Sequence, residues 1–302
     1  MSMPDSILIA GSGALATLFA ARLSAAGNPV TMFGTWSQGL TALKAHGAIL
    51  VRPDGSEVAH PVHVLAETPA VKFQHALVLV KSWQTERVAV QLGEFLDRDG
   101  LAITLQNGLG NRQILSSLLG AERVAQGVTT LGATLLAPGK VRLGGDGPLS
   151  LEVHPRLDAL AGLLERAGFQ VHLVPDANSL IWGKLVINSA INPLTAILRL
   201  KNGELLQNPA AKRLMANLAL ETATLAARQG ISLPFPDPVA AVEEVARLTA
   251  DNLSSMLQDV MRSAPTEIDA ICGAIHNLGD SLGFPTPYNG CMYRLVQAIS
   301  PS

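Results

Sequence analysis

The pattern of apolar and polar residues in the first half of the chain predicts short buried strands separated by helices. Helical periodicity is expected over residues 15–26 and 84–96. Apolar runs that end at glycine or polar residues predict strands at 6–10, 29–33, 75–80, 101–105, 124–131, 149–153 and 171–174. Strands that alternate with helices at this spacing are typical of a parallel, doubly wound sheet.

The pattern changes after Asp176, where helical periodicity replaces the short apolar runs. Helices are expected at 179–200, 209–229, 238–250, 254–261, 265–282 and 288–298. The predicted fold class is therefore α/β, with an N-terminal Rossmann-type doubly wound sheet followed by an all-α C-terminal domain. We expect the two domains to span residues 1–176 and 177–302.

One of the predicted helices carries a polar stripe on an apolar background. Lys184, Asn188 and Asn192 are spaced four residues apart among Ile, Leu, Val and Ala, which places them on one face of a helix. Polar groups in such surroundings are unfavourable unless a partner satisfies them. Lys184 alone also fits a lysine that reaches water, and Asn192 alone fits a residue that ends a helix before Pro193. The three together favour a site for a polar, anionic ligand.

Composition excludes several classes of protein. The chain has 302 residues, 15% charged residues and a net charge of −2, which gives no electrostatic footprint for nucleic acid or a membrane. A mean hydropathy of +0.30 argues against disorder. That hydropathy also allows more apolar surface than one subunit buries, so a homodimer is possible. We expect neither metal binding nor a disulfide, because the two cysteines, Cys272 and Cys291, have no zinc-site spacing.

The apolar stretch from Ile7 to Ala26 does not fit a signal peptide. It lacks a basic start, is interrupted by Gly11 and Gly13, and contains Arg22. We therefore expect a cytoplasmic protein.

The start of the chain fits a dinucleotide-binding fingerprint. Gly11-x-Gly13-x-x-Ala16 lies between a predicted strand and a predicted helix. The first glycine permits a tight turn, the second lets the backbone approach a pyrophosphate, and the small third residue lets helix and strand pack closely. A plain glycine-rich turn is the alternative. The position between strand and helix favours the fingerprint, with the phosphates at the helix N-terminus.

The end of the second predicted strand bears on the choice of dinucleotide. An acid there would bind the ribose hydroxyl of NAD, but no acid occurs between Asp5 and Asp54. The arginine expected for NADP is also missing, and Thr35 and Ser37 could instead bond a phosphate while Trp36 stacks on adenine. The sequence favours NADP (NADPH) over NAD.

Two later strands are followed by polar residues at the edge of the sheet where ligands bind. Lys81 follows the run that ends at Val80, and Asn107 follows the run that ends at Leu105. Lys81 also fits a solvated lysine at a strand end, and Asn107 before glycine also fits a simple turn. Their place beside the fingerprint strand favours a shared site.

The chain resembles the ketopantoate reductase (2-dehydropantoate 2-reductase) family over nearly its whole length. The matching segments are 11–16 (GSGALA), 80–84 (VKSWQ), 106–110 (QNGLG), 184–188 (KLVIN), 192–196 (NPLTA), 202–205 (NGEL), 254–259 (SSMLQD) and 266–269 (TEID). The resemblance implies NADPH-dependent reduction of 2-dehydropantoate to pantoate, a step towards pantothenate and coenzyme A. It also implies a dinucleotide-binding first domain and a second domain for substrate binding and catalysis.

The resemblance also implies roles for individual residues. Lys184 would be the general acid, and Glu267 would have a supporting catalytic role. Substrate-binding residues would be Asn107, Asn188, Asn192, Asn202 and Ser255. Cofactor-binding residues would be Gly11, Ser12, Gly13, Ala14, Leu15, Ala16, Thr35, Lys81, Asn107, Ala133 and Glu267.

Two positions depart from the family pattern, Ala16 and Thr35. Two of the implied site residues, Glu267 and Ser255, can also be explained by helix structure alone. Ala16 replaces a glycine, and Thr35 replaces a basic residue, which weakens the argument for NADPH but not for dinucleotide binding. Glu267, two residues after Pro265, also fits an acid in the first turn of a helix, where the dipole favours it. Ser255 also fits an ordinary serine at a helix end.

The implied chemistry suits the apolar stripe. Hydride transfer to a keto group makes an alkoxide that needs a proton, and desolvation of Lys184 would lower its pKa towards the working range, while Glu267 would oppose that shift. One alternative is a related reductase of a different 2-keto acid that uses NADH or NADPH. The other is a non-catalytic NADP-binding sensor, which has no use for a proton donor.

Overall fold

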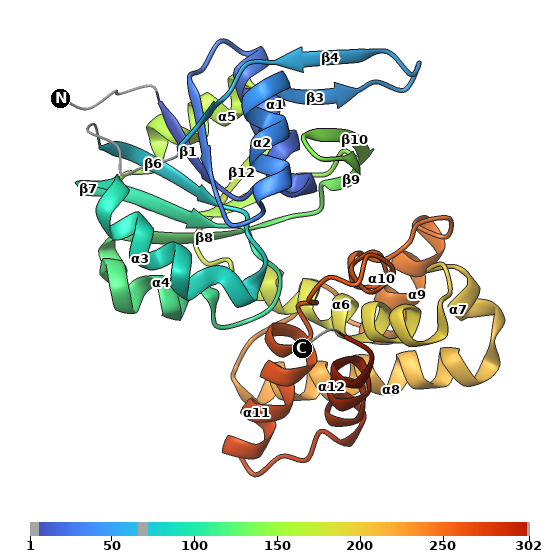
Figure 1. Ribbon diagram of the computed structural model, residues 1–302. Coiled ribbons are helices and arrows are strands. Elements are labelled where there is room, and N and C mark those ends of the chain that lie inside the picture. The colour runs from blue at the N-terminus through green and yellow to red at the C-terminus, as the bar shows by residue number, and fades with distance from the viewer. Residues whose placement is uncertain (1–5, 66–71, 301–302) are drawn as a thin grey trace. The chain divides into compact units, whose positions relative to one another are not determined.

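The computed structural model describes residues 6–65 and 72–300, which form two compact units (Figure 1). The first, here the sheet unit, comprises the chain up to Gln106 together with Asn111–Ala177. The second, here the helical unit, comprises Asn178 onward together with the four residues Asn107–Gly110. The sequence did not predict that these four residues leave the first unit to pack with the second.

The sheet unit is built on a sheet of eight strands in the order β12-β11-β8-β7-β6-β1-β2-β5. All neighbouring strands run parallel except β8 and β11, which are antiparallel. The strands are β1 (Ile7–Ala10), β2 (Val30–Phe33), β5 (His63–Val64), β6 (Phe73–Val78), β7 (Leu96–Thr104), β8 (Val124–Thr129), β11 (Leu149–Glu152) and β12 (Val171–Val174). The predicted doubly wound sheet is confirmed, with one antiparallel pair that was not predicted.

Both faces of this sheet are covered, which explains why its strands read as continuous apolar runs. Alternate residues of β1 enter two different cores. Ile7 and Ile9 pack with helices α1 (Ala14–Ala25) and α5 (Asp158–Arg166), whereas Leu8 and Ala10 pack with α3 (Thr85–Phe95) and α4 (Asn111–Leu119). Figure 1 shows α3 and α4 side by side, next to β7 and β8.

A second sheet of four strands, in the order β4-β3-β10-β9, was not predicted. Its strands are β3 (Ala48–Val51), β4 (Glu57–His60), β9 (Gly132–Ala137) and β10 (Lys140–Gly145), and α2 (Ser37–His46) precedes it in the chain. Most residues of these strands are half-buried or exposed. Three of the four strands therefore mix polar or small residues with apolar ones, and only β3 (AILV) is a continuous apolar run.

The helical unit matches the predicted helices except that α7 was not predicted and the helix expected over 265–282 differs. Its elements are α6 (Asn178–Leu198), α7 (Glu204–Gln207), α8 (Pro209–Arg228), α9 (Pro238–Leu248), α10 (Ser255–Met261), the π-helical turn η3 (Asp269–Gly273), α11 (Ala274–Ser281) and α12 (Pro287–Ile299). The helix expected over 265–282 begins only at Asp269, and its first part, η3, is a π-helical turn that continues directly into α11. Proline as first residue and a capping side chain just before it, Asn208 or Asp237, explain where α8 and α9 begin.

Helix α6 forms the core of the helical unit although it contains a proline. It is long and apolar enough to cross a membrane, but 67% of its most apolar window is buried inside the protein, as in a core helix. Pro193 has no N–H, so the carbonyl of Ser189 loses its usual helix partner. The thiol of Cys272, in η3, donates to that carbonyl at 3.9 Å. Cys272 thus has a structural partner, and burial raises the pKa of its thiol well above the usual range.

The two cysteines should differ sharply in reactivity. Cys272 is fully buried and Cys291 is exposed on α12, so one thiol should react rapidly with an aromatic disulfide reagent in the folded protein and two in denaturant. Cys291→Ser should abolish the rapid reaction, and Cys272→Ser should leave it intact. Rapid modification of both thiols in the native protein would contradict the burial of Cys272.

Candidate active site

The turn between β1 and α1 has the shape that a pyrophosphate needs. Gly11 has a φ of +132°, and a Cβ there would lie 3.0 Å from the carbonyl oxygen of Leu79, so only glycine fits without strain. Gly13 is exposed, and a Cβ there would meet nothing within 4 Å. No side chain caps α1, and its first turn has no acid. Ala16 is fully buried, as close packing of helix and strand requires. The predicted residues Gly11–Ala16 therefore leave open backbone at a helix N-terminus, which fits a dinucleotide phosphate.

Residues after β2 and β6, the two neighbours of β1, are joined by side-chain hydrogen bonds. Thr35 follows β2, and the amide of Gln84 donates to its hydroxyl. Gln84 lies in the short 3-10 turn η1 (Ser82–Gln84), which Lys81 precedes. Gln106 holds this turn in place, because its Nε2 donates to the Val80 carbonyl at 3.0 Å and to Thr85 Oγ1 at 2.8 Å. The structure thus brings Thr35 and Lys81 to neighbouring segments and adds Gln84 and Gln106, which sequence reasoning missed.

Ala133 lies apart from the fingerprint turn in the sequence and in a different sheet. It is a half-buried residue of β9 and pairs with Leu143 of β10. Its role as a backbone contact to the cofactor stays a prediction.

The polar stripe on α6 is present as predicted. Lys184 and Asn188 are half-buried, and Asn192 is only 6% exposed. Glu267, which lies two residues before η3, is 5% exposed and accepts a hydrogen bond from Asn107 Nδ2 at 3.0 Å. Burial lowers the pKa of Lys184 to about 8, and the Glu267 carboxylate opposes that shift. The helical unit therefore joins three predicted site residues, Asn107, Lys184 and Glu267, in one electrostatic cluster.

Asn202 is held rigidly but keeps one polar atom unused. Its backbone N–H donates to the Asn252 carbonyl at 3.1 Å, and its Nδ2 donates to Thr249 Oγ1 at 2.9 Å. Its buried Oδ1 has no hydrogen-bond partner among the residues that the structure describes. An orphaned buried acceptor is unfavourable in a protein alone, so it fits a ligand donor.

The structure distinguishes two adjacent serines. Ser255 is exposed at the first position of α10, whereas Ser254 is buried and caps that helix by accepting from the Leu257 N–H at 3.1 Å. Ser254 Oγ also lies 2.7 Å from Thr195 Oγ1 on α6. Sequence reasoning named Ser255 and missed Ser254, which ties α10 to the helix that carries the stripe.

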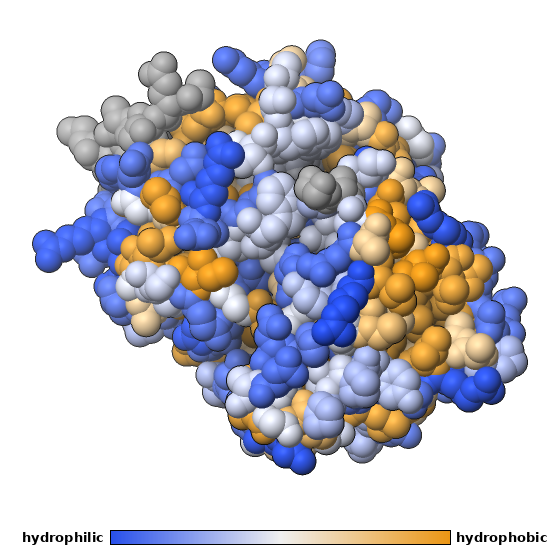
Figure 2. Space-filling view, turned by 60° about the horizontal axis from the view of Figure 1, so that its bottom comes forward, coloured by the Kyte–Doolittle hydropathy of each residue, from blue (hydrophilic) through white to orange (hydrophobic). Residues whose placement is uncertain are grey.

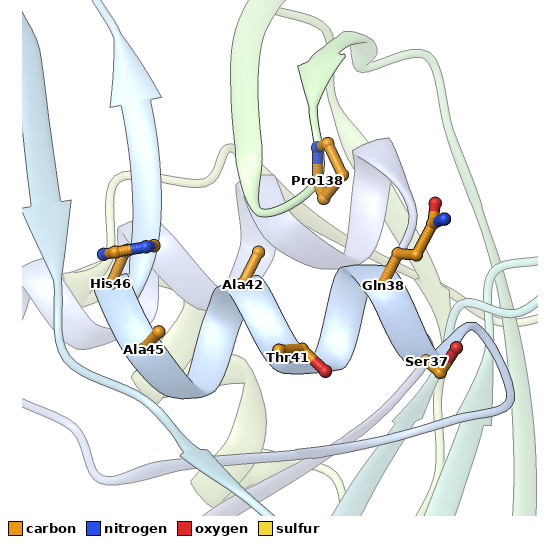
Figure 3. A pocket seen from close by; sticks show the side chains of 7 residues that line it. All are labelled: Ser37, Gln38, Thr41, Ala42, Ala45, His46 and Pro138. Carbon is orange, nitrogen blue, oxygen red and sulfur yellow. The ribbon is translucent and has the colours of Figure 1, made fainter.

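A shallow hollow of about 400 Å³ lies beside α2. Figure 3 shows the α2 side chains that line it and Pro138 from the β9–β10 turn. Its lining includes Ser37, which the sequence suggested could bond a phosphate, and none of the other predicted cofactor or substrate residues.

The two glycines of the fingerprint should have separable functions. Gly11→Ala should destabilise the fold by about 1–3 kcal/mol, because the new Cβ meets backbone at a strained φ. Gly13→Ala should leave stability nearly unchanged and weaken nicotinamide dinucleotide binding at least about tenfold, because the methyl group occupies the open approach to the backbone. Urea unfolding and a fluorescence titration measure the two effects.

Gly27→Ala is the matched control, since Gly27 has a φ of +83° and open space around its Cβ. It should cost stability through backbone strain and leave cofactor affinity unchanged. Equal cofactor affinity in Gly13→Ala and wild type would contradict the predicted phosphate contact.

Burial of Lys184 should make stability depend on pH. Because its pKa falls from 10.5 to about 8 in the folded protein, the unfolded chain holds a proton between these values that the folded protein has lost. The free energy of unfolding of wild type, relative to Lys184→Met, should therefore rise with pH across that window, by at most about 3 kcal/mol. Urea unfolding at several pH values measures this difference. For the exposed-lysine control, Lys44→Met, the difference in free energy of unfolding from wild type should not change across this pH window. If the difference for Lys184→Met were also independent of pH, the lowered pKa of Lys184 would be contradicted.

Comparison with known proteins identifies the family to which this chain is similar. The family model described as ketopantoate reductase PanE/ApbA matches residues 7–156, and the model for its C-terminal part matches residues 176–300. A 2-dehydropantoate 2-reductase of Archaeoglobus fulgidus is 36% identical over 97% of both chains. A second, of Halobacterium salinarum, is 32% identical over 89% of this chain and 90% of that protein.

Solved structures match over nearly the full length of the chain. A PanE/ApbA family ketopantoate reductase from Ralstonia eutropha JMP134 matches with a TM-score of 0.90 and 30% identity, covering 97% of this chain and 98% of that one. A D-mandelate dehydrogenase solved with NADH and anilino(oxo)acetate also has a TM-score of 0.90, with 29% identity and the same coverage. The family resemblance predicted from sequence is confirmed: the chain belongs to the ketopantoate reductase family and is an oxidoreductase acting on a CH–OH group.

Proposed function

We propose that the protein reduces 2-dehydropantoate to pantoate, with NADPH as the hydride donor, on the route to pantothenate and coenzyme A. The observation that carries this proposal is the cluster of Lys184, on α6, with Glu267 and Asn107. A half-buried lysine with a pKa of about 8 is influenced by the carboxylate of Glu267, which Asn107 holds through a hydrogen bond. The family and the names of the curated relatives support the substrate.

Lys184 would supply the proton that reduction requires. When bound, the nicotinamide cofactor supplies a hydride to the keto carbon, and the carbonyl oxygen becomes an alkoxide. The ammonium of Lys184 donates its proton to that oxygen, so the product is a hydroxyl and the lysine is left neutral. A pKa of about 8 suits this step, because the group is still largely protonated at neutral pH and is a stronger acid than an ordinary lysine.

The amide side chains would orient the substrate. Asn188 and Asn192 share the face of α6 that carries Lys184. The orphaned Oδ1 of Asn202 would accept from a substrate hydroxyl, and the exposed hydroxyl of Ser255 would add a further contact. Pantoate chemistry offers both a carboxylate and hydroxyls for these groups.

In the sheet unit, the backbone of Gly11–Ala16 would hold the pyrophosphate, and Lys81 and Ala133 would contact the rest of the dinucleotide. NADPH is favoured because no acid follows β2 to repel a 2′-phosphate. Thr35 has a hydroxyl but no positive charge, and Gln84 donates to it. The mandelate dehydrogenase relative was solved with NADH, so binding of NADH is the alternative that the cofactor test must exclude.

That same relative supports a second candidate, a reductase of a different 2-keto acid. The Lys184 chemistry is the same for any such substrate. The choice among 2-keto acids would then be made by the side chains that contact the part of the substrate beyond its keto and carboxylate groups.

We further propose a cytoplasmic protein that takes a small-molecule substrate and binds neither nucleic acid nor membrane. Self-association is supported by a broad apolar area over the helical unit in Figure 2. Exposed apolar side chains of that unit include Leu198 (42%), Leu248 (75%) and Met261 (58%).

The decisive test follows NADPH absorbance with 2-dehydropantoate as substrate. Lys184→Ala should lose about a hundredfold or more in turnover, as expected for a lost general acid, while the exposed-lysine control Lys44→Ala should keep wild-type turnover. Wild-type turnover should fall as pH rises above about 8, because Lys184 loses its proton. Glu267→Gln should shift that decline to lower pH, since the opposing carboxylate charge is removed. Unchanged turnover in Lys184→Ala would overturn the mechanism.

The same assay separates the alternatives. Faster turnover of an aryl or another branched 2-keto acid than of 2-dehydropantoate would favour the second candidate. A clear preference for NADH would overturn the choice of NADPH, and Thr35→Arg should raise NADPH preference. Dinucleotide binding without any substrate-dependent oxidation would identify the sensor that the sequence left open.

A further inference from the structure

The segment Asn107–Gly110 packs against the turn that follows Glu267. The Leu109 N–H donates to the Ala270 carbonyl at 2.9 Å. Gly108 has a φ of +81°, and a Cβ there would lie 2.3 Å from the same carbonyl oxygen. No other residue fits this close backbone approach, so Gly108 determines how near the segment comes to η3.

A second element holds the same turn. Tyr293 of α12 donates its hydroxyl to Asp269 Oδ1 at 2.8 Å, and Gln297 Nε2 donates to that oxygen at 3.3 Å. A Cβ on Gly273, at the other end of η3, would come within 2.9 Å of the Tyr293 ring. The ring therefore lies against one end of η3 while its hydroxyl binds the other.

The turn itself is unusual. The Gly273 N–H donates to the Ile268 carbonyl at 2.9 Å, five residues back, so one extra residue is accommodated in this turn. Such wide turns are rare and occur frequently at functional sites. The Ile271 N–H donates to the carbonyl of Glu267 at 3.1 Å, so the wide turn is hydrogen-bonded directly to that residue.

We propose that η3 positions the Glu267 carboxylate, and that Gly108 and Tyr293 are positioning residues for the reduction, acting through Glu267. This inference rests on the proposed function of Lys184 and Glu267. Neither Gly108 nor Tyr293 contributes a group to the chemistry; each fixes the backbone from which the carboxylate extends.

The first test removes one hydroxyl. Tyr293→Phe should lower kcat about three- to fivefold, which corresponds to about 0.7–1 kcal/mol, the net contribution of one ordinary hydrogen bond, and should leave the dissociation constant of NADPH within about twofold of wild type. Tyr288→Phe is the matched control, because Tyr288 is also on α12 and its hydroxyl has no hydrogen bond in the described part of the chain. It should match wild type.

A double-mutant cycle shows whether the effect passes through Glu267. In a Glu267→Gln background, Tyr293→Phe should lower kcat no further, because the carboxylate that it positions is already gone. A purely structural role would instead give the same fold loss in both backgrounds, and that outcome would overturn the proposal.

The second test uses two glycines of one segment. Gly108→Ala should lower kcat at least about tenfold more than Gly110→Ala, because Gly110 has a similar φ of +91° but a Cβ there would meet nothing within 4 Å. Equal losses in the two variants would contradict the contact with Ala270. If Gly108→Ala does not fold, the double-mutant cycle of Tyr293→Phe with Glu267→Gln tests the proposal instead.

Hydrogen–deuterium exchange separates this inference from the proposed function. Tyr293→Phe should speed exchange in the peptide that contains η3, and Tyr288→Phe should not. If wild type reduces no 2-keto acid, the proposed function fails, while unchanged exchange in Tyr293→Phe refutes the inference whatever the activity.

Discussion

The central constraint in the helical unit is the burial of Lys184, a residue that must be able to carry a positive charge in apolar surroundings. Burial alone favours the neutral amine, and the Glu267 carboxylate favours the ammonium, so the pKa settles at about 8. Removing one member of a buried charged pair typically costs about 3–5 kcal/mol, because the other is left uncompensated. The position of Glu267 therefore constrains stability and, in the proposed reaction, would constrain the chemistry as well; Asn107 donates a hydrogen bond to this carboxylate.

In the sheet unit the main constraint is different: the backbone N–H groups of the β1–α1 turn must stay accessible to a ligand. A dinucleotide phosphate needs N–H groups that no side chain covers, and the β1–α1 turn provides them because Gly13 is open and α1 has no capping side chain. The same turn must be rigid, and the tight fit of Gly11 against Leu79 and Ala16 supplies that rigidity. Glycine is thus required at the two positions for opposite reasons, crowding at one and openness at the other.

Sequence patterns predicted those elements that can be recognised from residues close together in the chain. The buried strands and α1 appear as apolar runs, and the stripe on α6 appears from helical spacing alone. The small sheet was missed because its strands are half-exposed, and Asn107–Gly110 was read as a strand end because its contacts with Ala270 and Glu267 lie far along the chain. Glu267 fitted the first turn of a helix equally well, and only the structure shows that a π-helical turn follows it and that Asn107 binds it. Ser254 was overlooked for Ser255 because nothing local distinguishes two adjacent serines.

The irregular features of the helical unit have a common consequence. Pro193 leaves the Ser189 carbonyl without its helix partner, and the donor that replaces it, Cys272, belongs to η3. The turn is thereby tied to α6 by the cysteine, to α12 by Tyr293, and to Asn107–Gly110 by the Leu109 amide. A helical turn of ordinary geometry would advance the chain differently and lose some of these bonds. The proline, the π-helical turn and the left-handed glycine, each unfavourable alone, together hold the carboxylate of Glu267 to the helix that carries Lys184.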